Sequence, residues 1–208
     1  MMSKEFTKRI LSTLILLPLV FYLIINGSYM LIFFTTICFI VAFYEWIKMV
    51  KNWFYKTCGF LFLVISFYSF YIISKDFFVI CFIVLICSST DVGGYVFGKL
   101  FKGPKLTKIS PNKTYAGMIG GYFLSLICLL IINNLEPYSL STIKFFILTV
   151  LISTVSQIGD IIISYFKRLS KIKNTGNLIP GHGGLLDRID GMIFVFPFYY
   201  LIDFTGYL

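Results

Sequence analysis

Residues 164–190 read SYFKRLSKIKNTGNLIPGHGGLLDRID, and this stretch interrupts two long apolar segments near the end of the chain. It begins inside the first segment, passes through a basic loop rich in glycine and proline, and ends in the cluster Asp187-Arg188-Ile189-Asp190. Helices buried in lipid need no such loop for their stability. The stretch therefore indicates a site that handles phosphates and a metal ion at a membrane surface.

The segments on both sides belong to a chain dominated by apolar residues. Of its 208 residues, 58% are hydrophobic and 13% are charged. A soluble domain of this length could not bury that much apolar surface. Because a spanning helix needs about 20 mostly apolar residues, the pattern predicts an all-α, polytopic integral membrane protein with about seven transmembrane helices. The expected spans are residues 10–26, 29–47, 57–74, 77–98, 114–133, 143–166 and 191–207.

The N-terminal apolar run raises the question of a cleaved signal peptide. Lys4, Lys8 and Arg9 precede it in the order that signal peptides show. However, the run over residues 10–25 is long for this purpose, and no Ala-x-Ala-like cleavage site follows it. We expect a retained first helix.

The basic residues predict an orientation in the membrane. If the polar segments alternate between the two faces, starting inside, the inside segments hold all of the 18 Lys and Arg residues except Lys75 and Lys144. Cytoplasmic segments are enriched in Lys and Arg, so the N-terminus and the 164–190 stretch are expected in the cytoplasm, with the C-terminus outside. The net charge of +9 is then explained by membrane topology and by attraction to anionic membrane lipids, or by the binding of a polyanionic substrate. No nucleic-acid partner is expected.

Four of the nine acidic residues lie where a carboxylate is costly or clustered, namely Asp91, Asp160, Asp187 and Asp190. Two of them fall within apolar spans, where a carboxylate costs about 2.5–3.5 kcal/mol at the bilayer centre. Such residues face a polar cavity and pair with a cation. The alternative is that each is a buried, hydrogen-bonded Asp that only fixes helix packing. The presence of four such residues in one chain argues against this alternative. The five cysteines lie in or beside apolar segments and are interpreted as packing residues.

Helical spacing predicts that several of these polar residues converge. Gln157, Asp160, Ser164 and Lys167 are separated by 3, 4 and 3 residues, which places them on one stripe of a helix. Asp187 and Asp190 would share one face of the first turn of the next helix. Three carboxylates presented by two helices predict a site for Mg²⁺, which takes one or two carboxylates with water and phosphates.

The loop Pro180-Gly181-His182-Gly183-Gly184 supplies complementary groups. Glycines allow the backbone to approach a ligand and offer amide donors to phosphate oxygens. His182 is the only histidine, so a zinc site is not expected. A lone histidine is often structural, but its place among glycines in a basic loop favours a functional role. Positive charge comes from Lys167, Arg168, Lys171 and Lys173.

A second polar region follows Asp91. Its three glycines, Gly93, Gly94 and Gly98, allow either close helix packing or a ligand contact, and both interpretations stay open. The run Ser110-Pro111-Asn112-Lys113-Thr114 precedes a span, so Ser110 or Thr114 is a candidate helix cap. Lys113 is placed to reach a phosphate. Neither loop matches the P-loop pattern.

Together, these motifs resemble the signature of phosphatidate cytidylyltransferases, also called CDP-diglyceride synthetases. The resemblance is specific over about residues 85–192 and general before them, where Glu45-Trp46 also fits. Asn174 stands where the family usually has Asp, and Tyr115-Ala116 where it commonly has Trp-Glu. The matching positions are Ser164, Lys167, Arg168, Lys173, Gly176, residues 180–184, Asp187, Arg188 and Asp190, with Gln157, Gly159-Asp160, Ser110-Pro111, Lys113-Thr114, Gly120-Gly121 and residues 91–99 upstream.

The resemblance implies that CTP and phosphatidate react to give CDP-diacylglycerol and pyrophosphate, at Mg²⁺ with K⁺ as a second cation. Phosphatidate would enter from the bilayer and CTP from the cytoplasm, and a homodimer is expected from the family. The expected metal ligands are Asp160, Ser164, Asp187 and Asp190. The expected catalytic residues are Asp160, Lys167, His182, Asp187 and Asp190. The expected substrate-binding residues are Asp91, Ser110, Lys113, Ser164, Arg168, Lys173, Gly183, Gly184 and Arg188.

The expected organisation is a single transmembrane domain over residues 1–208. Residues 1–76 would form N-terminal membrane helices, and residues 77–208 a catalytic membrane core with cytoplasmic loops 99–113 and 167–190. The scarcity of alanine and the excess of Lys over Arg suggest an AT-rich genome, that of a reduced bacterium or of an organelle. The expected location is a bacterial inner membrane, with the active site facing the cytoplasm. Three alternatives stay open: a CTP-dependent polyprenol or lipid kinase, an ion-coupled transporter, and an inactive homologue.

Overall fold

The fold is that of a computed structural model of the 208-residue chain. It describes residues 18, 20–25, 27–107, 110, 113–135, 142–176, 178 and 183–206. Across these ranges the secondary structure is helical, apart from turns, short loops and isolated bridge residues such as the pair Lys105 and Thr114. The helices are α2 (Ser28–Met49), α3 (Trp53–Ile73), α4 (Phe77–Phe101), α5 (Tyr115–Leu135), α6 (Thr142–Leu169), α7 (Leu186–Ile189) and α8 (Met192–Phe204).

Five helices, α2 to α6, are long and apolar enough to cross a membrane. The helix α8 has 13 residues, about 20 Å, and is shorter than the hydrocarbon core of about 30 Å. The predicted all-α, polytopic membrane protein is confirmed, whereas the count of seven spans is not. The expected first span, residues 10–26, lies mostly outside the described residues. The expectation that it is a retained helix rather than a signal peptide therefore stays a prediction.

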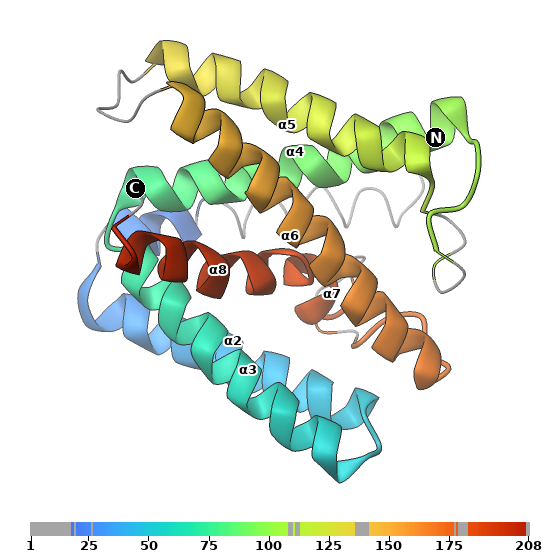
Figure 1. The fold of residues 1–208 in the computed structure, drawn as a ribbon. Coiled ribbons are helices and arrows are strands. Elements are labelled where there is room, and N and C mark those ends of the chain that lie inside the picture. Colours follow the sequence, from blue (N-terminus) through green and yellow to red (C-terminus); the bar gives the residue numbers. More distant parts are fainter. Residues whose placement is uncertain are drawn as a thin grey trace, which may run out of the picture. The chain divides into compact units, whose positions relative to one another are not determined.

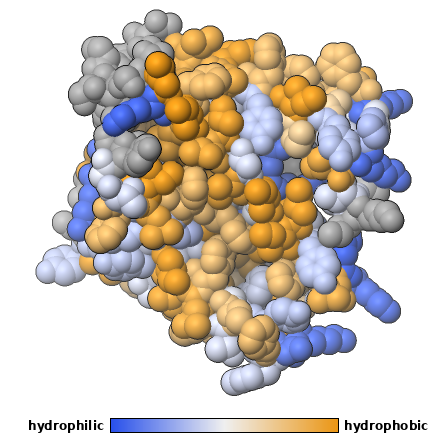
Figure 2. Space-filling model, viewed as in Figure 1, coloured by the Kyte–Doolittle hydropathy of each residue, from blue (hydrophilic) through white to orange (hydrophobic). Residues whose placement is uncertain are grey.

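Large apolar side chains are exposed along these helices, including Tyr29 at 88% and Leu100 at 70%. Figure 2 shows hydrophobic side chains over much of the face in view. Soluble monomers rarely expose contiguous apolar patches of this kind. In a bilayer the same side chains face lipid, while the helices satisfy their own backbone hydrogen bonds.

The chain folds into two compact units. The first contains residues 1–77 and 166–190, and the second contains residues 78–165 and 191–208. Most of the polar stretch that interrupts the apolar segments therefore packs with the N-terminal helices, although residues 78–165 separate the two along the chain. This packing is a tertiary feature that spacing along the sequence does not reveal.

In the first unit, α2 and α3 lie side by side and are joined by a short connection (Figure 1). Asn52 caps α3, because its side chain accepts a hydrogen bond from the Phe54 amide at 2.9 Å. The Trp46 indole donates to the Tyr55 carbonyl at 3.1 Å. Gly59 faces the same indole, since a Cβ there would collide with Trp46. These contacts fix the cytoplasmic end predicted for the hairpin.

In the second unit, α4 and α5 approach closely through glycines. A Cβ at Gly93 would lie 2.9 Å from the carbonyl carbon of Gly120. A Cβ at Gly117 would lie 2.7 Å from the Gly94 carbonyl oxygen. Neither approach leaves room for a side chain, so the packing interpretation is confirmed for Gly93.

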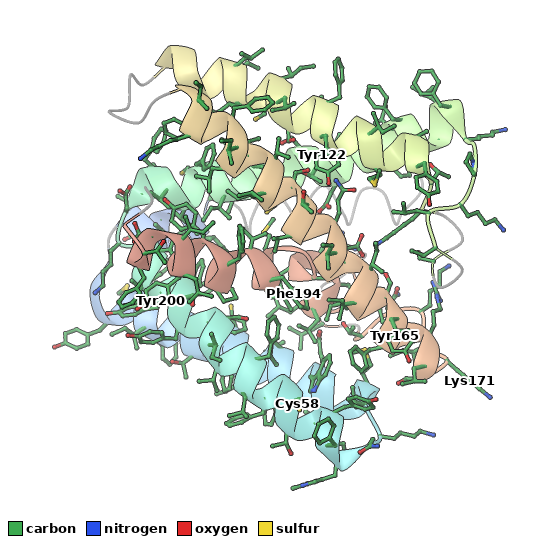
Figure 3. All side chains as sticks on the ribbon, viewed as in Figure 1. Cys58, Tyr122, Tyr165, Lys171, Phe194 and Tyr200 are labelled. Atoms are coloured by element: carbon green, nitrogen blue, oxygen red, sulfur yellow. The ribbon has the colours of Figure 1, made fainter. Side chains whose placement is uncertain are left out.

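Polar side chains join the helices of the second unit. Tyr122 of α5 hydrogen-bonds to Thr154 of α6 at 2.9 Å (Figure 3), and Thr90 of α4 donates to Ser153 of α6 at 3.0 Å. At the start of α5, Thr114 accepts from the Gly117 amide at 3.1 Å. Thr114 is therefore the helix cap that the sequence suggested.

Candidate active site

Asp187 is the centre of the hydrogen-bond network in the first unit. It lies on the single turn α7, and its Oδ2 atom accepts from the amides of Thr175 at 2.8 Å and Gly184 at 3.0 Å. Its Oδ1 atom accepts from Lys167 Nζ at 3.1 Å. Gly183, with φ at +90°, makes the turn that brings the Gly184 amide to this carboxylate.

Lys167 lies at the end of α6 and contacts both carboxylates of the acidic cluster. Its Nζ atom is 3.1 Å from Asp187 Oδ1 and 3.6 Å from Asp190 Oδ2. The three side chains are 12%, 7% and 16% exposed. The predicted convergence of Asp187 and Asp190 is confirmed, with Asp187 on the separate turn α7 rather than in the first turn of the following helix.

Glu45 is a carboxylate of the first unit to which sequence reasoning assigned no role. It lies near the end of α2, is 3% exposed, and accepts hydrogen bonds from the amides of Leu185 and Leu186, each at 2.9 Å. Its Oε2 atom also accepts from the Thr175 hydroxyl at 2.8 Å. The signal was present, because Glu45 is an acidic residue within a predicted apolar span.

In the second unit, Asp160 forms an ion pair with Lys113. Lys113 Nζ lies 2.6 Å from Asp160 Oδ2, and Ser164 donates to Asp160 Oδ1 at 3.3 Å. The Asp160–Ser164 contact agrees with the helical stripe predicted on α6. The side chains of Lys113 and Asp160 are 22% and 31% exposed, although the Lys113 Nζ atom itself is buried.

The remaining predicted site residues differ in what the structure says of them. Arg168, Lys173 and Arg188 are exposed in the first unit, as is Asp91 on α4 of the second. Lys171, a further cation of the basic loop, points away from the end of α6 (Figure 3). Ser110 is buried in a turn in which its carbonyl accepts from the Lys113 amide at 3.0 Å. His182, with Pro180 and Gly181, lies outside the described residues.

Two glycines of the loop have a structural role that the sequence did not predict. A Cβ at Gly184 would lie 2.5 Å from Glu45 Oε2, and a Cβ at Gly176 would lie 2.7 Å from Glu45 Oε1. These positions therefore need glycine because a buried carboxylate lies against them. The Gly184 amide already donates to Asp187, and its predicted contact with substrate stays a prediction.

The donor atoms fit a hard cation such as Mg²⁺, which prefers carboxylate oxygens. Asp187 and Asp190 both lie against the ammonium group of Lys167, so two negative charges share one positive charge. Within the described residues, no group of three or more His, Cys, Asp or Glu side chains gathers closely enough to hold a metal ion. Asp160 belongs to the other unit, and the three-carboxylate site stays a prediction.

Comparison with known proteins places this chain in a class of nucleotide-transfer proteins. The chain belongs to the cytidylyltransferase family, whose sequence profile matches residues 54–205. The matched range includes Lys113, Asp160, Lys167, Asp187 and Asp190.

Curated relatives carry a more specific name. The chain is 41% identical over 119 residues to the phosphatidate cytidylyltransferase of Staphylococcus saprophyticus, covering 57% of this chain and 46% of the relative. It is 40% identical over 115 residues to that of Bacillus subtilis, covering 55% and 43%. It is 43% identical over 114 residues to that of Staphylococcus aureus, covering 54% and 44%. The matched region thus spans less than half the length of each relative.

Proposed function

We propose that this chain transfers CMP from CTP to phosphatidate, producing CDP-diacylglycerol and pyrophosphate. The observation that carries the proposal is the Lys167 ammonium group held between the carboxylates of Asp187 and Asp190. Family membership supports the same reaction class, and the names of the bacterial relatives supply the lipid substrate.

In the proposed reaction, a phosphate oxygen of phosphatidate attacks the α-phosphorus of CTP. A new oxygen–phosphorus bond forms, the bond from the α-phosphorus to the bridging oxygen breaks, and pyrophosphate leaves with the bonding electrons. The attacking oxygen is already anionic, so the reaction needs no strong general base. The main barrier is the repulsion between two polyanions, which positive groups in the site reduce.

Lys167 and Lys113 are the described cations best placed for this role. Each is held by carboxylates, Lys167 by Asp187 and Asp190 and Lys113 by Asp160. The carboxylates orient the ammonium groups before substrate binds, which lowers the cost of ordering long side chains. Further phosphate contacts are proposed for Ser110, Arg168, Lys173, His182, Gly183, Gly184 and Arg188, with Asp91 orienting substrate.

Mg²⁺, with K⁺ as a second cation, would supply positive charge to the triphosphate and the leaving pyrophosphate. Asp160, Asp187 and Asp190 would hold the metal, with Ser164 beside them. The positive-inside pattern supports a cytoplasmic site in a bacterial inner membrane. CTP would enter from the cytoplasm and phosphatidate from the bilayer, and a homodimer remains part of the proposal.

The reaction is tested with purified chain, phosphatidate, Mg²⁺ and CTP radiolabelled at the α-phosphate. We expect label in the extracted lipid and release of pyrophosphate. Label that stays soluble as CDP, together with a newly phosphorylated lipid, would instead identify a lipid kinase. Absence of turnover with ion uptake into vesicles would identify a transporter.

The site is tested by Asp187→Asn, which keeps the shape of the side chain and removes its negative charge. We expect turnover to be lost while the protein still inserts in the membrane and elutes as a folded species. Full activity in this variant would refute the assignment of Asp187 to the site. Asp203→Asn, an exposed residue of α8, is the matched control and should keep full activity.

A further inference from the structure

We propose that Glu45 is a positioning residue of this site, which fixes the turn before Asp187 so that the Asp187 carboxylate meets Lys167. The inference rests on the proposed function for its effect on catalysis. It extends the site to a helix near the other end of the chain, because Glu45 belongs to α2 and hydrogen-bonds to Thr175, Leu185 and Leu186.

The backbone amides of the turn before Asp187 donate hydrogen bonds to two carboxylates, those of Asp187 and Glu45. Three consecutive amides, those of Gly184, Leu185 and Leu186, point to carboxylate oxygens. The first donates to Asp187, and the next two donate to Glu45. Hydrogen bonds to a charged acceptor are roughly twice as strong as neutral ones. Glu45 therefore decides the backbone path immediately before Asp187.

Thr175 links the same two carboxylates from the other end of the loop. Its hydroxyl donates to Glu45 Oε2 at 2.8 Å, and its amide donates to Asp187 Oδ2 at 2.8 Å. Both ends of the segment between Thr175 and Gly184 are thus tied to one pair of acceptors. A substitution of Glu45 should therefore alter the position of the Asp187 carboxylate in two ways, through Thr175 and through the turn.

The backbone is shaped around the Glu45 carboxylate. Gly176 and Gly184 lie against its two oxygens so closely that a methyl group at either position would collide with it. The carboxylate is 3% exposed, so water cannot replace the lost acceptor without a rearrangement. This close fit indicates that the Glu45 carboxylate is an integral part of the site's structure.

The end of α2 also supports the other partner of the Asp187–Lys167 pair. The Trp46 ring packs edge-on against Phe166, with 4.9 Å between ring centroids. The Ser170 hydroxyl hydrogen-bonds to the Met49 carbonyl. These contacts lie on both sides of Lys167 along the chain. The last turn of α2 therefore holds both the lysine and the turn that carries its carboxylate partner.

The test compares Glu45→Gln with the wild-type chain in detergent solution. Glutamine keeps the volume, but its amide group replaces one acceptor with a donor that faces backbone N–H groups. Removing an outer partner of a metal-site ligand typically costs about 10–100-fold in activity or metal affinity. We expect kcat to fall by about that factor, the Mg²⁺ concentration for half-maximal rate to rise, and KM for phosphatidate to change little.

Two readouts do not depend on turnover. The first is the binding of Mn²⁺, measured by the electron paramagnetic resonance signal of free Mn²⁺, which should weaken in Glu45→Gln. The second is limited trypsin cleavage after Lys173 and Arg188, compared with cleavage after Lys102 and Lys105 as an internal reference. Cleavage at the first pair should increase selectively, because the turn has lost an anchor.

A second variant keeps the test valid if Glu45→Gln does not fold. Thr175→Val removes the hydroxyl donor to Glu45 and retains the amide donor to Asp187, so it should shift the same readouts by a smaller factor. Thr175→Ser should restore wild-type values, since it returns the hydroxyl. Asp203→Asn is the control for removal of an exposed carboxylate.

The outcomes separate this inference from the proposed function. Wild-type kcat, metal requirement, Mn²⁺ binding and cleavage pattern in Glu45→Gln would overturn the positioning role. If the wild-type chain transfers no CMP, the proposed function fails, while Mn²⁺ binding and trypsin cleavage still decide whether Glu45 orders the turn. A lower melting temperature with unchanged kcat and Mg²⁺ requirement would show a purely structural role and would also overturn it.

Discussion

At the residue scale, paired charges dominate the candidate site. Lys167 compensates two carboxylates in the first unit, and Lys113 compensates Asp160 in the second. The sequence assigned the lysines to phosphate and the carboxylates to metal. The structure shows that each lysine is paired with a carboxylate, so a phosphate group must compete with that carboxylate for the ammonium group.

Lys167→Met tests the charge balance of the first unit independently of catalysis. Methionine keeps the apolar stem but leaves Asp187 and Asp190 without their shared counter-charge. We expect a loss of about 3 kcal/mol in stability, at the low end of the range for a buried pair that has lost one partner. Unfolding in a titration with sodium dodecyl sulfate measures this loss.

Lys75→Met is the control, because it makes the same change at an exposed position of the same unit. It loses a contact with the Tyr71 ring, whose centroid lies 5.3 Å from Lys75 Nζ. Such a contact contributes about 0.5–1 kcal/mol at an exposed site, so the unfolding midpoint should fall much less than that of Lys167→Met. Equal midpoints for Lys167→Met and Lys75→Met would show that the contacts of Lys167 contribute no more to stability than this exposed contact.

At the element scale, two local features could be predicted from sequence. Helix boundaries followed from hydropathy, and the α4 helix over Phe77–Phe101 begins at the predicted residue. The Thr114 cap followed from its place before an apolar run. Both depend on neighbours along the chain. The glycines of α4 stayed ambiguous, because their function depends on which helix lies opposite.

Gly93→Ala and Gly94→Ala separate packing from helix propensity on the same helix. A methyl group at Gly93 would meet the backbone of α5, whereas one at Gly94 would lie 3.8 Å from the Gly117 carbonyl oxygen, an ordinary contact. We expect Gly93→Ala to destabilise the protein by about 1–3 kcal/mol through overpacking. Gly94→Ala should leave stability unchanged or raise it by up to about 1 kcal/mol.

The comparison is made by unfolding both variants under identical detergent conditions. A Gly93→Ala variant as stable as Gly94→Ala would contradict the close approach of α4 and α5. Because neither residue is assigned to substrate, the result does not depend on the proposed function.

At the scale of the whole molecule, the distribution of basic residues predicts the topology. The helix α3 has 21 residues, about 32 Å, which is enough to cross the hydrocarbon core. Lys51 precedes it and Lys75 follows it, so the two lysines are expected on opposite faces of the membrane. The positive-inside pattern predicts that Lys51 lies in the cytoplasm.

Cysteine labelling tests this orientation. In a chain whose five native cysteines are replaced by alanine, Lys75→Cys should react with a membrane-impermeant maleimide in intact cells. Lys51→Cys should react only after the cells are opened. The reverse pattern would place the proposed site on the external face, where it would have no access to cytoplasmic CTP.

Hydropathy and helical spacing by themselves determined the membrane class, most helix boundaries and the convergence of Asp187 with Asp190. These features depend on contacts within a few residues or on burial in lipid, which a linear pattern records. Only the tertiary structure decided that Glu45 anchors the turn before Asp187, that Gly176 and Gly184 exist to accommodate its carboxylate, and that Lys113 pairs with Asp160. Glu45 and Leu186 are far apart along the chain and meet through the packing of α2 against the loop, so no local periodicity encodes their hydrogen bond.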